Sequence, residues 1–188
     1  PARIPPMPAP PLTVAPLGDA CLVVRFGTAA EVDLAATIRS AADCLFAAPP
    51  AGLVDLLPTF TTLALFFDPV ATDADLLAAA VLGRIAANYR RSAAKLEQIS
   101  DAASLEPAPP RVIEIPVMYG GDAGPDLAAV AAGAGIDADA VVRLHAGVTH
   151  VVGMIGFAPG FPYLLGLPEA LLLPRRATPR TRVPGGSV

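Results

Sequence analysis

Three apolar runs in the first part of the chain have the length and composition of β-strands. They cover residues 20–26, 52–57 and 61–67 and are rich in leucine, valine and phenylalanine. Glycine, proline or aspartate stands next to each run, as is common where strands begin and end. We therefore predict a strand in each of the three segments.

Two helices are predicted around these strands. Thr28 and Glu31 have the spacing of a capping box, and apolar residues then recur at helical intervals until Pro49-Pro50 ends the pattern. A second helix is expected to begin near Thr72 or Asp73. Its apolar face is predicted to consist of Leu77, Val81, Ile85 and Tyr89.

The order strand, helix, strand, strand, helix predicts a ferredoxin-like α/β sandwich, which we place at residues 16–99. Seven prolines fall within the first sixteen positions, and we expect residues 1–15 to form a disordered arm. Residues 100–110 are small, polar and rich in proline, which is typical of a linker. Residues 111–188 are predicted to form a second domain.

The second domain contains two more strand-like runs. Residues 112–117 form one, with Pro116 near its end, which favours an edge strand. Residues 149–157 form the other. After Gly156, glycine and proline are too dense for regular helix, so we expect loops joined by short strands. The chain ends at Val188 where a new strand is due, and we expect it to be part of a longer protein.

Two short helices are predicted between these runs. Gly124-Pro125-Asp126 is expected to open the first, with proline at a permitted first-turn position, and Gly133 and Gly135 to close it. Asp137 is expected to cap the second, which would run through His145.

Composition and charge narrow the classes of function. A net charge of -4 and a pI near 5.0 argue against nucleic acid as a general partner. No apolar run approaches the roughly 18 residues that cross a bilayer, and the first residues lack the apolar core of a secretory signal. We therefore predict a cytoplasmic protein with neither a nucleic-acid nor a membrane partner.

The familiar catalytic motifs are missing from the sequence. It has no G-x-S-x-G elbow, Walker phosphate loop, HExxH or paired CxxC. His145 and His150 are the two histidines, and no cysteine or carboxylate cluster surrounds them. A protein-bound metal is therefore not expected.

An aromatic loop is the first candidate for a binding site. Phe157, Phe161 and Tyr163 alternate with glycines, including Gly160, and with two prolines. Glycine permits unusual backbone angles and proline fixes bends, so such a loop can hold rings around a pocket that binds substrate or nucleotide. The alternative interpretation is that these rings fill the core.

A cationic segment near the end of the chain is the second candidate. No acidic residue follows Glu169, whereas four arginines do, at Arg175, Arg176, Arg180 and Arg182. Arginine binds carboxylates and phosphates through two parallel hydrogen bonds, and the flanking prolines would fix its direction. The alternative is a solvated basic loop, or ion pairs with an acidic partner subunit.

Two further residues are candidates for catalysis. His145, at the end of a predicted helix, is a possible general acid or base near neutral pH, or else a group that satisfies helix carbonyls. Ser187 follows two glycines, and its hydroxyl would serve either an oxyanion or a turn.

Taken together, these residues resemble a family that contains the B subunit of 5-oxoprolinase, allophanate hydrolase subunit 1 and the sporulation histidine-kinase inhibitor. The resemblance is most specific in the second half of the chain. It rests there on Tyr119-Gly-Gly, Gly124-Pro-Asp-Leu127, His145, Gly156-Phe-Ala-Pro-Gly-Phe-Pro-Tyr163, Pro174-Arg-Arg, Thr178-Pro-Arg180 and Val183-Pro-Gly-Gly-Ser-Val188.

The resemblance implies a cyclophilin-like β-barrel at residues 111–188, incomplete at its C-terminal end, after the small α/β domain. It also implies a separate or fused companion subunit of related fold, and either ATP-dependent opening of 5-oxoproline to glutamate or hydrolysis of allophanate. ATP would be a co-substrate that brings its own Mg²⁺. Arg175, Arg176 and Arg180 would suit a phosphate or the substrate carboxylate, with Arg180 among the catalytic groups.

Three functions follow from this resemblance. The first is a subunit of a heteromeric amide hydrolase that acts on a small-molecule substrate. The second is a regulator that binds and inhibits a sensor histidine kinase. The third, a prolyl isomerase, would rest on analogy of fold alone.

Overall fold

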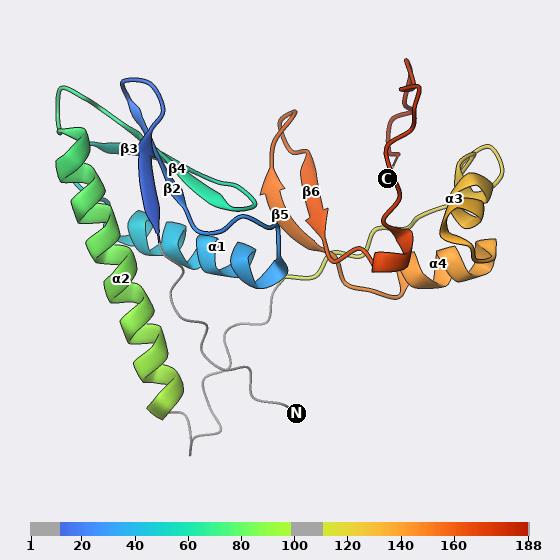
Figure 1. Cartoon of the computed structure of the whole chain (residues 1–188), viewed down its shortest axis with the longest axis horizontal. Coiled ribbons are helices and arrows are strands. Elements are labelled where there is room, and N and C mark those ends of the chain that lie inside the picture. The colour runs from blue at the N-terminus through green and yellow to red at the C-terminus, as the bar shows by residue number, and fades with distance from the viewer. Residues whose placement is uncertain (1–11, 99–110, 188) are drawn as a thin grey trace. The chain divides into compact units, whose positions relative to one another are not determined.

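The computed structural model describes residues 12–98 and 111–187, apart from the side chains of residues 92–98. These residues form two compact units (Figure 1). The first contains residues 12–98 and 151–165, and the second contains residues 111–150 and 166–187.

The first unit is built on a four-stranded antiparallel sheet with the order β1-β2-β4-β3. Strand β4 pairs with both β2 and β3 and therefore lies between them, although β3 precedes it in the sequence. The strands are β1 (Thr13–Pro16), β2 (Cys21–Arg25), β3 (Leu53–Pro58) and β4 (Thr62–Phe67). The last three confirm the strands predicted from the apolar runs.

Two helices, α1 (Val32–Ala47) and α2 (Ala74–Gln98), cover one face of this sheet (Figure 1). Alternate residues of β2 and β4 point to the helices, because neighbouring side chains of a strand project to opposite faces. The largest fully buried side chains of this core are Val24, Phe26, Ile38, Leu45, Leu63, Leu65, Leu77, Val81 and Ile85. The predicted apolar face of α2 is thus confirmed, with Tyr89 packed at its edge.

A two-stranded hairpin, β5 (Val151–Ile155) and β6 (Pro162–Leu165), completes the first unit. Its register shifts between Val152 and Met154, so Gly153 is the bulged residue. A side chain at position 153 would collide with Leu165 and with the ring of Phe60, in the turn between β3 and β4. The missing Cβ therefore lets the hairpin pack directly on that turn.

The second unit contains α3 (Leu127–Ala134), α4 (Ala138–Ala146) and the short 3-10 helix η2 (Glu169–Leu171). Gly135 ends α3 in the left-handed conformation, and the Asp137 carboxylate caps α4 by accepting a hydrogen bond from the Ala140 N–H at 2.6 Å. Ala131, Val141 and Leu171 form its small core. Both predicted helices are therefore confirmed.

Three local predictions are wrong. Residues 13–15 belong to β1 and pair with β2, so the predicted disordered arm does not hold there. Helix α1 begins at Val32, and Thr28 lies outside it and forms no capping box. Residues 112–117 form no strand, because no strand among the described residues pairs with them, and Val112, Ile113 and Ile115 are 65–67% exposed.

The fold is thus a mixture of helices and antiparallel sheets, in agreement with the helices and strands that the sequence predicts. The hairpin groups with the first unit, although the sequence places its residues in the second domain. The ferredoxin-like and cyclophilin-like descriptions and the domain boundaries stay predictions. Residues 1–11 and the predicted linker at residues 100–110 lie outside the described residues.

The packing at Gly153 predicts the effect of a single methyl group. In Gly153→Ala the new Cβ would lie 2.8 Å from Leu165 Cγ and 2.9 Å from Phe60 Cε1. Overpacking of this kind costs roughly 1–3 kcal/mol, so we expect the free energy of unfolding in urea to fall by that amount.

The matched control is Gly83→Ala, at an exposed position inside α2 where no atom lies within 4 Å of the added Cβ. Alanine is the better helix former, so this variant should be more stable by about 0.5–1 kcal/mol. Equal stability of Gly153→Ala and the wild type would contradict the packing of the hairpin on Phe60.

Candidate functional site

A series of aromatic rings runs from the turn between β3 and β4 to the tip of the β5–β6 hairpin. The ring centroids of Phe60 and Tyr163 are 5.7 Å apart, those of Tyr163 and Phe161 are 5.1 Å apart, and those of Phe161 and Phe157 are 5.5 Å apart. Each pair is arranged edge to face, which is a favourable geometry for aromatic rings. We call these four residues the aromatic series.

The hairpin loop holds the outermost ring in an unusual conformation. Phe157 has a φ of 61° and is 89% exposed. A bulky residue in the left-handed region is strained, and such strain is kept only where neighbouring structure imposes it. Here the Gly156 N–H donates to the Phe161 carbonyl at 3.0 Å, and Gly160 turns the chain with a φ of 78°. The loop therefore presents a large ring to solvent.

In the second unit, a carboxylate binds two of the predicted arginines. Asp126 accepts two hydrogen bonds from the guanidinium of Arg180 and one from Arg176, all at 2.6 Å. The two bonds from Arg180 form the parallel pair that fixes a guanidinium plane. We call these three residues the arginine cluster.

The arginine cluster is partly open to solvent. The side chains of Asp126, Arg180 and Arg176 are 38%, 36% and 57% exposed. One carboxylate against two guanidinium groups leaves an excess positive charge, and each arginine keeps N–H donors that Asp126 does not use. A hollow of about 420 Å³ adjoins the cluster, lined by Asp126, Ala129, Val130, Gly133, Leu173, Pro174 and Arg176.

The second unit also contains a hydrogen-bonded histidine pair. The Tyr119 hydroxyl lies 2.7 Å from Nδ1 of His145, and Nε2–H of His150 donates to the His145 carbonyl at 3.3 Å. The two histidine rings are 5.3 Å apart. Burial, and to a smaller extent the charge of His150, lowers the pKa of His145 below its usual value. His145 is therefore neutral near pH 7, and a neutral ring is what a general base requires.

The other predicted site residues have simpler surroundings. The Ser187 hydroxyl donates to the Pro184 carbonyl at 3.0 Å, which is the turn bond that was its alternative role. Arg175 is exposed and forms none of the ion pairs found among the described residues. Within those residues, no three histidine, cysteine or acidic side chains are grouped to hold a metal ion.

The structure brings the predicted residues together in two separate sets. Phe157, Gly160, Phe161 and Tyr163 lie in the hairpin of the first unit, whereas His145, Ser187 and the arginines lie in the second. Three residues that contact them are not among the site residues predicted from the sequence: Phe60, Tyr119 and Asp126. Tyr119 and Asp126 are part of the motifs that carry the family resemblance, but Phe60 has no signal in the sequence.

The histidine pair leads to a prediction about titration. In the wild type, the NMR-detected pKa of His145 should lie below 6.5. In His150→Gln it should rise part of the way toward that value, because the neighbouring charge is lost while the larger effect, burial, remains. With two histidines in the chain, both resonances are easily followed.

The same shift has a consequence for stability. A histidine whose pKa is lower in the folded state takes up its proton more readily when unfolded, so its contribution to stability falls as the pH drops below about 6.5. Replacing His145 by Gln should reduce the loss of stability on acidification. For the titration, an unchanged pKa of His145 in His150→Gln would contradict the effect of the His150 charge on His145.

Comparison with known proteins places these features in a family. A family model described as carboxyltransferase domain, subdomain C and D, matches residues 12–188. The B subunit of 5-oxoprolinase from Bacillus subtilis (strain 168) is 33% identical over 172 residues, which are 92% of this chain and 70% of that protein. The B subunit of 5-oxoprolinase from Escherichia coli O157:H7 is 58% identical over 88 residues, which are 47% of this chain and 40% of that protein.

A solved structure shows the same similarity. The crystal structure of TTHA0988 matches with a TM-score of 0.64 and 33% sequence identity, over 87% of this chain and 28% of that chain. None of the helices in residues 12–98 and 111–187 has both the length and the apolar character needed to cross a membrane. The match to residues 12–188 and the identity to the Bacillus protein confirm the family resemblance: the chain belongs to the carboxyltransferase-domain family, subdomains C and D.

Proposed function

We propose that this chain is one subunit of an ATP-dependent amidase complex that opens 5-oxoproline to glutamate. The observation that carries the proposal is the similarity to a B subunit of 5-oxoprolinase over 92% of the chain. A second relative of the same name is 58% identical over 88 residues. Allophanate, the other substrate implied by the family, is the competing choice.

The chemistry explains why ATP is required. A lactam carbonyl is a poor electrophile, because its nitrogen donates electron density and is a poor leaving group. Transfer of the terminal phosphate of ATP to the lactam oxygen turns that oxygen into a leaving group. A water molecule adds to the activated carbon, the ring C–N bond breaks, and the nitrogen gains a proton, which leaves an acyl phosphate. A second water molecule hydrolyses this acyl phosphate to the carboxylate. ADP and phosphate are released, and Mg²⁺ enters with ATP.

The arginine cluster is the proposed anion site of the second unit. Its excess positive charge and unused N–H donors suit a phosphate or a carboxylate. Asp126 holds the guanidinium planes of Arg176 and Arg180 in place, so little further ordering is needed when an anion binds. Arg175, which follows Pro174 directly, would add a third positive charge.

We assign the remaining predicted residues to proton transfer and ring binding. His145, held at Nδ1 by Tyr119, would accept or deliver a proton. The Ser187 hydroxyl would turn from its turn bond toward an oxyanion. The exposed end of the aromatic series, at Phe157 and Phe161, would stack on a flat ring of the substrate or nucleotide.

The assembly belongs to the same proposal. We propose a companion subunit of related fold, a ferredoxin-like first domain, and a cyclophilin-like barrel to which residues 111–188 contribute. ATP is a cytoplasmic fuel, so we propose a cytoplasmic location. The activity is assigned to a complex because the similar curated proteins are named as subunits of 5-oxoprolinase. The aligned residues are 40% of one relative's length and 28% of the TTHA0988 chain.

The first test is the activity of the assembled complex. We expect the chain, co-expressed with its companion subunit, to release glutamate and ADP from 5-oxoproline and ATP in equal amounts. Allophanate is assayed in parallel by ammonia release. Turnover of allophanate alone would reject the choice of substrate, and turnover of neither compound would reject the proposed function.

The second test concerns the arginine cluster. Arg180→Ala should weaken anion binding by about 1–3 kcal/mol, which appears as a roughly 5- to 150-fold loss of kcat/KM. Arg180→Lys keeps the charge but loses the parallel pair of hydrogen bonds, so we expect an intermediate loss.

The matched control is Arg182→Ala, two residues away, because Arg182 forms none of the ion pairs among the described residues. It should retain nearly full activity. Similar losses in Arg180→Ala and Arg182→Ala would indicate a general effect of positive charge and would remove Arg180 from the site.

A further inference from the structure

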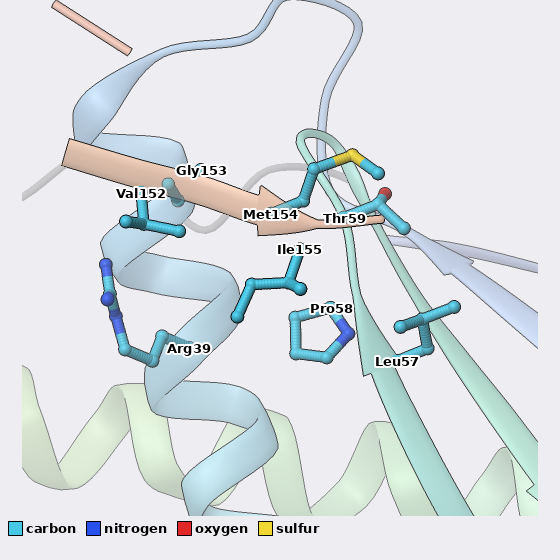
Figure 2. A pocket seen from close by; sticks show the side chains of 9 residues that line it. Arg39, Leu57, Pro58, Thr59, Val152, Gly153, Met154 and Ile155 are labelled. Atoms are coloured by element: carbon cyan, nitrogen blue, oxygen red, sulfur yellow. The ribbon is translucent and has the colours of Figure 1, made fainter. Parts of the chain in front are cut away.

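The first unit contains a small apolar pocket whose lining includes no residue of the aromatic series (Figure 2). Its volume is about 230 Å³. Three elements enclose it: α1, the end of β3 with the following turn, and β5. The lining residues are Ala35, Arg39, Leu57, Pro58, Thr59, Val152, Gly153, Met154 and Ile155.

The walls of the pocket are apolar side chains that remain open to solvent. Val152 and Ile155 are 41% and 56% exposed, and Leu57 is 45% exposed. These residues lie in well-formed strands, so their exposure is imposed by the fold. An exposed apolar surface that is concave and ordered is the usual form of a small-molecule site.

Among the polar side chains that line the pocket, only the Arg39 guanidinium is charged. The Thr59 hydroxyl is already engaged, since it lies 2.7 Å from the Thr62 hydroxyl and 3.1 Å from the Thr62 carbonyl. Arg39 forms none of the ion pairs among the described residues. Figure 2 shows its side chain extending from α1 toward Val152. A lone guanidinium beside apolar walls is complementary to a lone carboxylate on an apolar body.

We propose that this pocket binds a compact organic monoanion. Its carboxylate would pair with Arg39, and its body would lie against Pro58, Val152 and Ile155. A pocket of about 230 Å³ suits a ligand of one small ring and is too small for a nucleoside triphosphate. The presence of one guanidinium, where the arginine cluster has two, also favours a single negative charge.

The identity of the monoanion rests on the proposed function. 5-Oxoproline is a five-membered lactam with one carboxylate, so it has the required size, charge and apolar ring atoms. The pocket would then be the subsite for the amide substrate. The proposal that the pocket binds a monoanion rests on the pocket and Arg39 alone.

The test uses the methionine methyl groups of the intact chain as local reporters. Met154 lines the pocket, whereas Met118 lies in the second unit. In a titration of ¹³C-methyl-methionine protein with 5-oxoproline, we expect the Met154 signal to shift with saturation and the Met118 signal to stay. The neutral lactam 2-pyrrolidinone, which lacks the carboxylate, should bind at least tenfold more weakly.

Two variants test the contribution of the charge and the contribution of the cavity to binding separately. Arg39→Gln should weaken 5-oxoproline binding about tenfold or more and leave 2-pyrrolidinone unaffected, because it removes a charge-assisted hydrogen bond. Val152→Phe should fill the cavity and abolish the shift for both compounds. The control is Arg90→Gln, an exposed arginine of α2 that hydrogen-bonds the carbonyl of Ala86 in its own helix, and it should bind like the wild type.

The outcomes distinguish this inference from the proposed function. Binding of 5-oxoproline that neither Arg39→Gln nor Val152→Phe weakens would overturn the pocket and leave the function intact. Arg39-dependent binding of acetate or pyruvate without any binding of 5-oxoproline would support the pocket and reject that substrate. Failure of all three anions to shift Met154 would overturn the inference.

Discussion

The contact between Phe60 and Gly153 is the constraint on which the surface of the first unit depends. These residues are far apart in the sequence, and the ring of Phe60 occupies the space that a side chain at position 153 would take. An isolated two-stranded hairpin is marginal in water, so β5 and β6 need a surface to pack on. Phe60 provides it and begins the aromatic series, and Gly153 on the other side of the contact lines the pocket.

The second unit is organised by charge more than by burial. Its core is small, and the arginine cluster that ties the C-terminal segment to Asp126 is partly exposed. Ion pairs at this level of exposure contribute little to stability, about 1 kcal/mol or less each. The value of the cluster is geometric: Asp126 fixes two flexible arginine side chains in one place, and their positive charge still exceeds its own.

The features that the sequence predicted correctly depend on residues close together in the chain. The features that it missed depend on contacts between distant segments. The Asp137 cap, the left-handed Gly135 and the apolar face of α2 each depend on residues within a few positions of one another, so a single sequence is enough to find them. Residues 112–117 have the composition of a strand, but a strand forms only when another pairs with it. Phe60 and Arg39 take part in the aromatic series and the pocket only because β5 packs against the turn after β3 and against α1. Nothing near either residue in the sequence indicates this.

The two units differ in the ligands that they suit, and this difference bears on why we propose a complex. The first unit offers apolar walls with a single guanidinium, which match a small ring with one charge. The second offers concentrated positive charge, which matches a phosphate. Phosphate transfer to a lactam requires both ligands within bonding distance. The proposed reaction therefore needs both ligands at one place, which is a further reason to propose that the chain acts with a companion subunit.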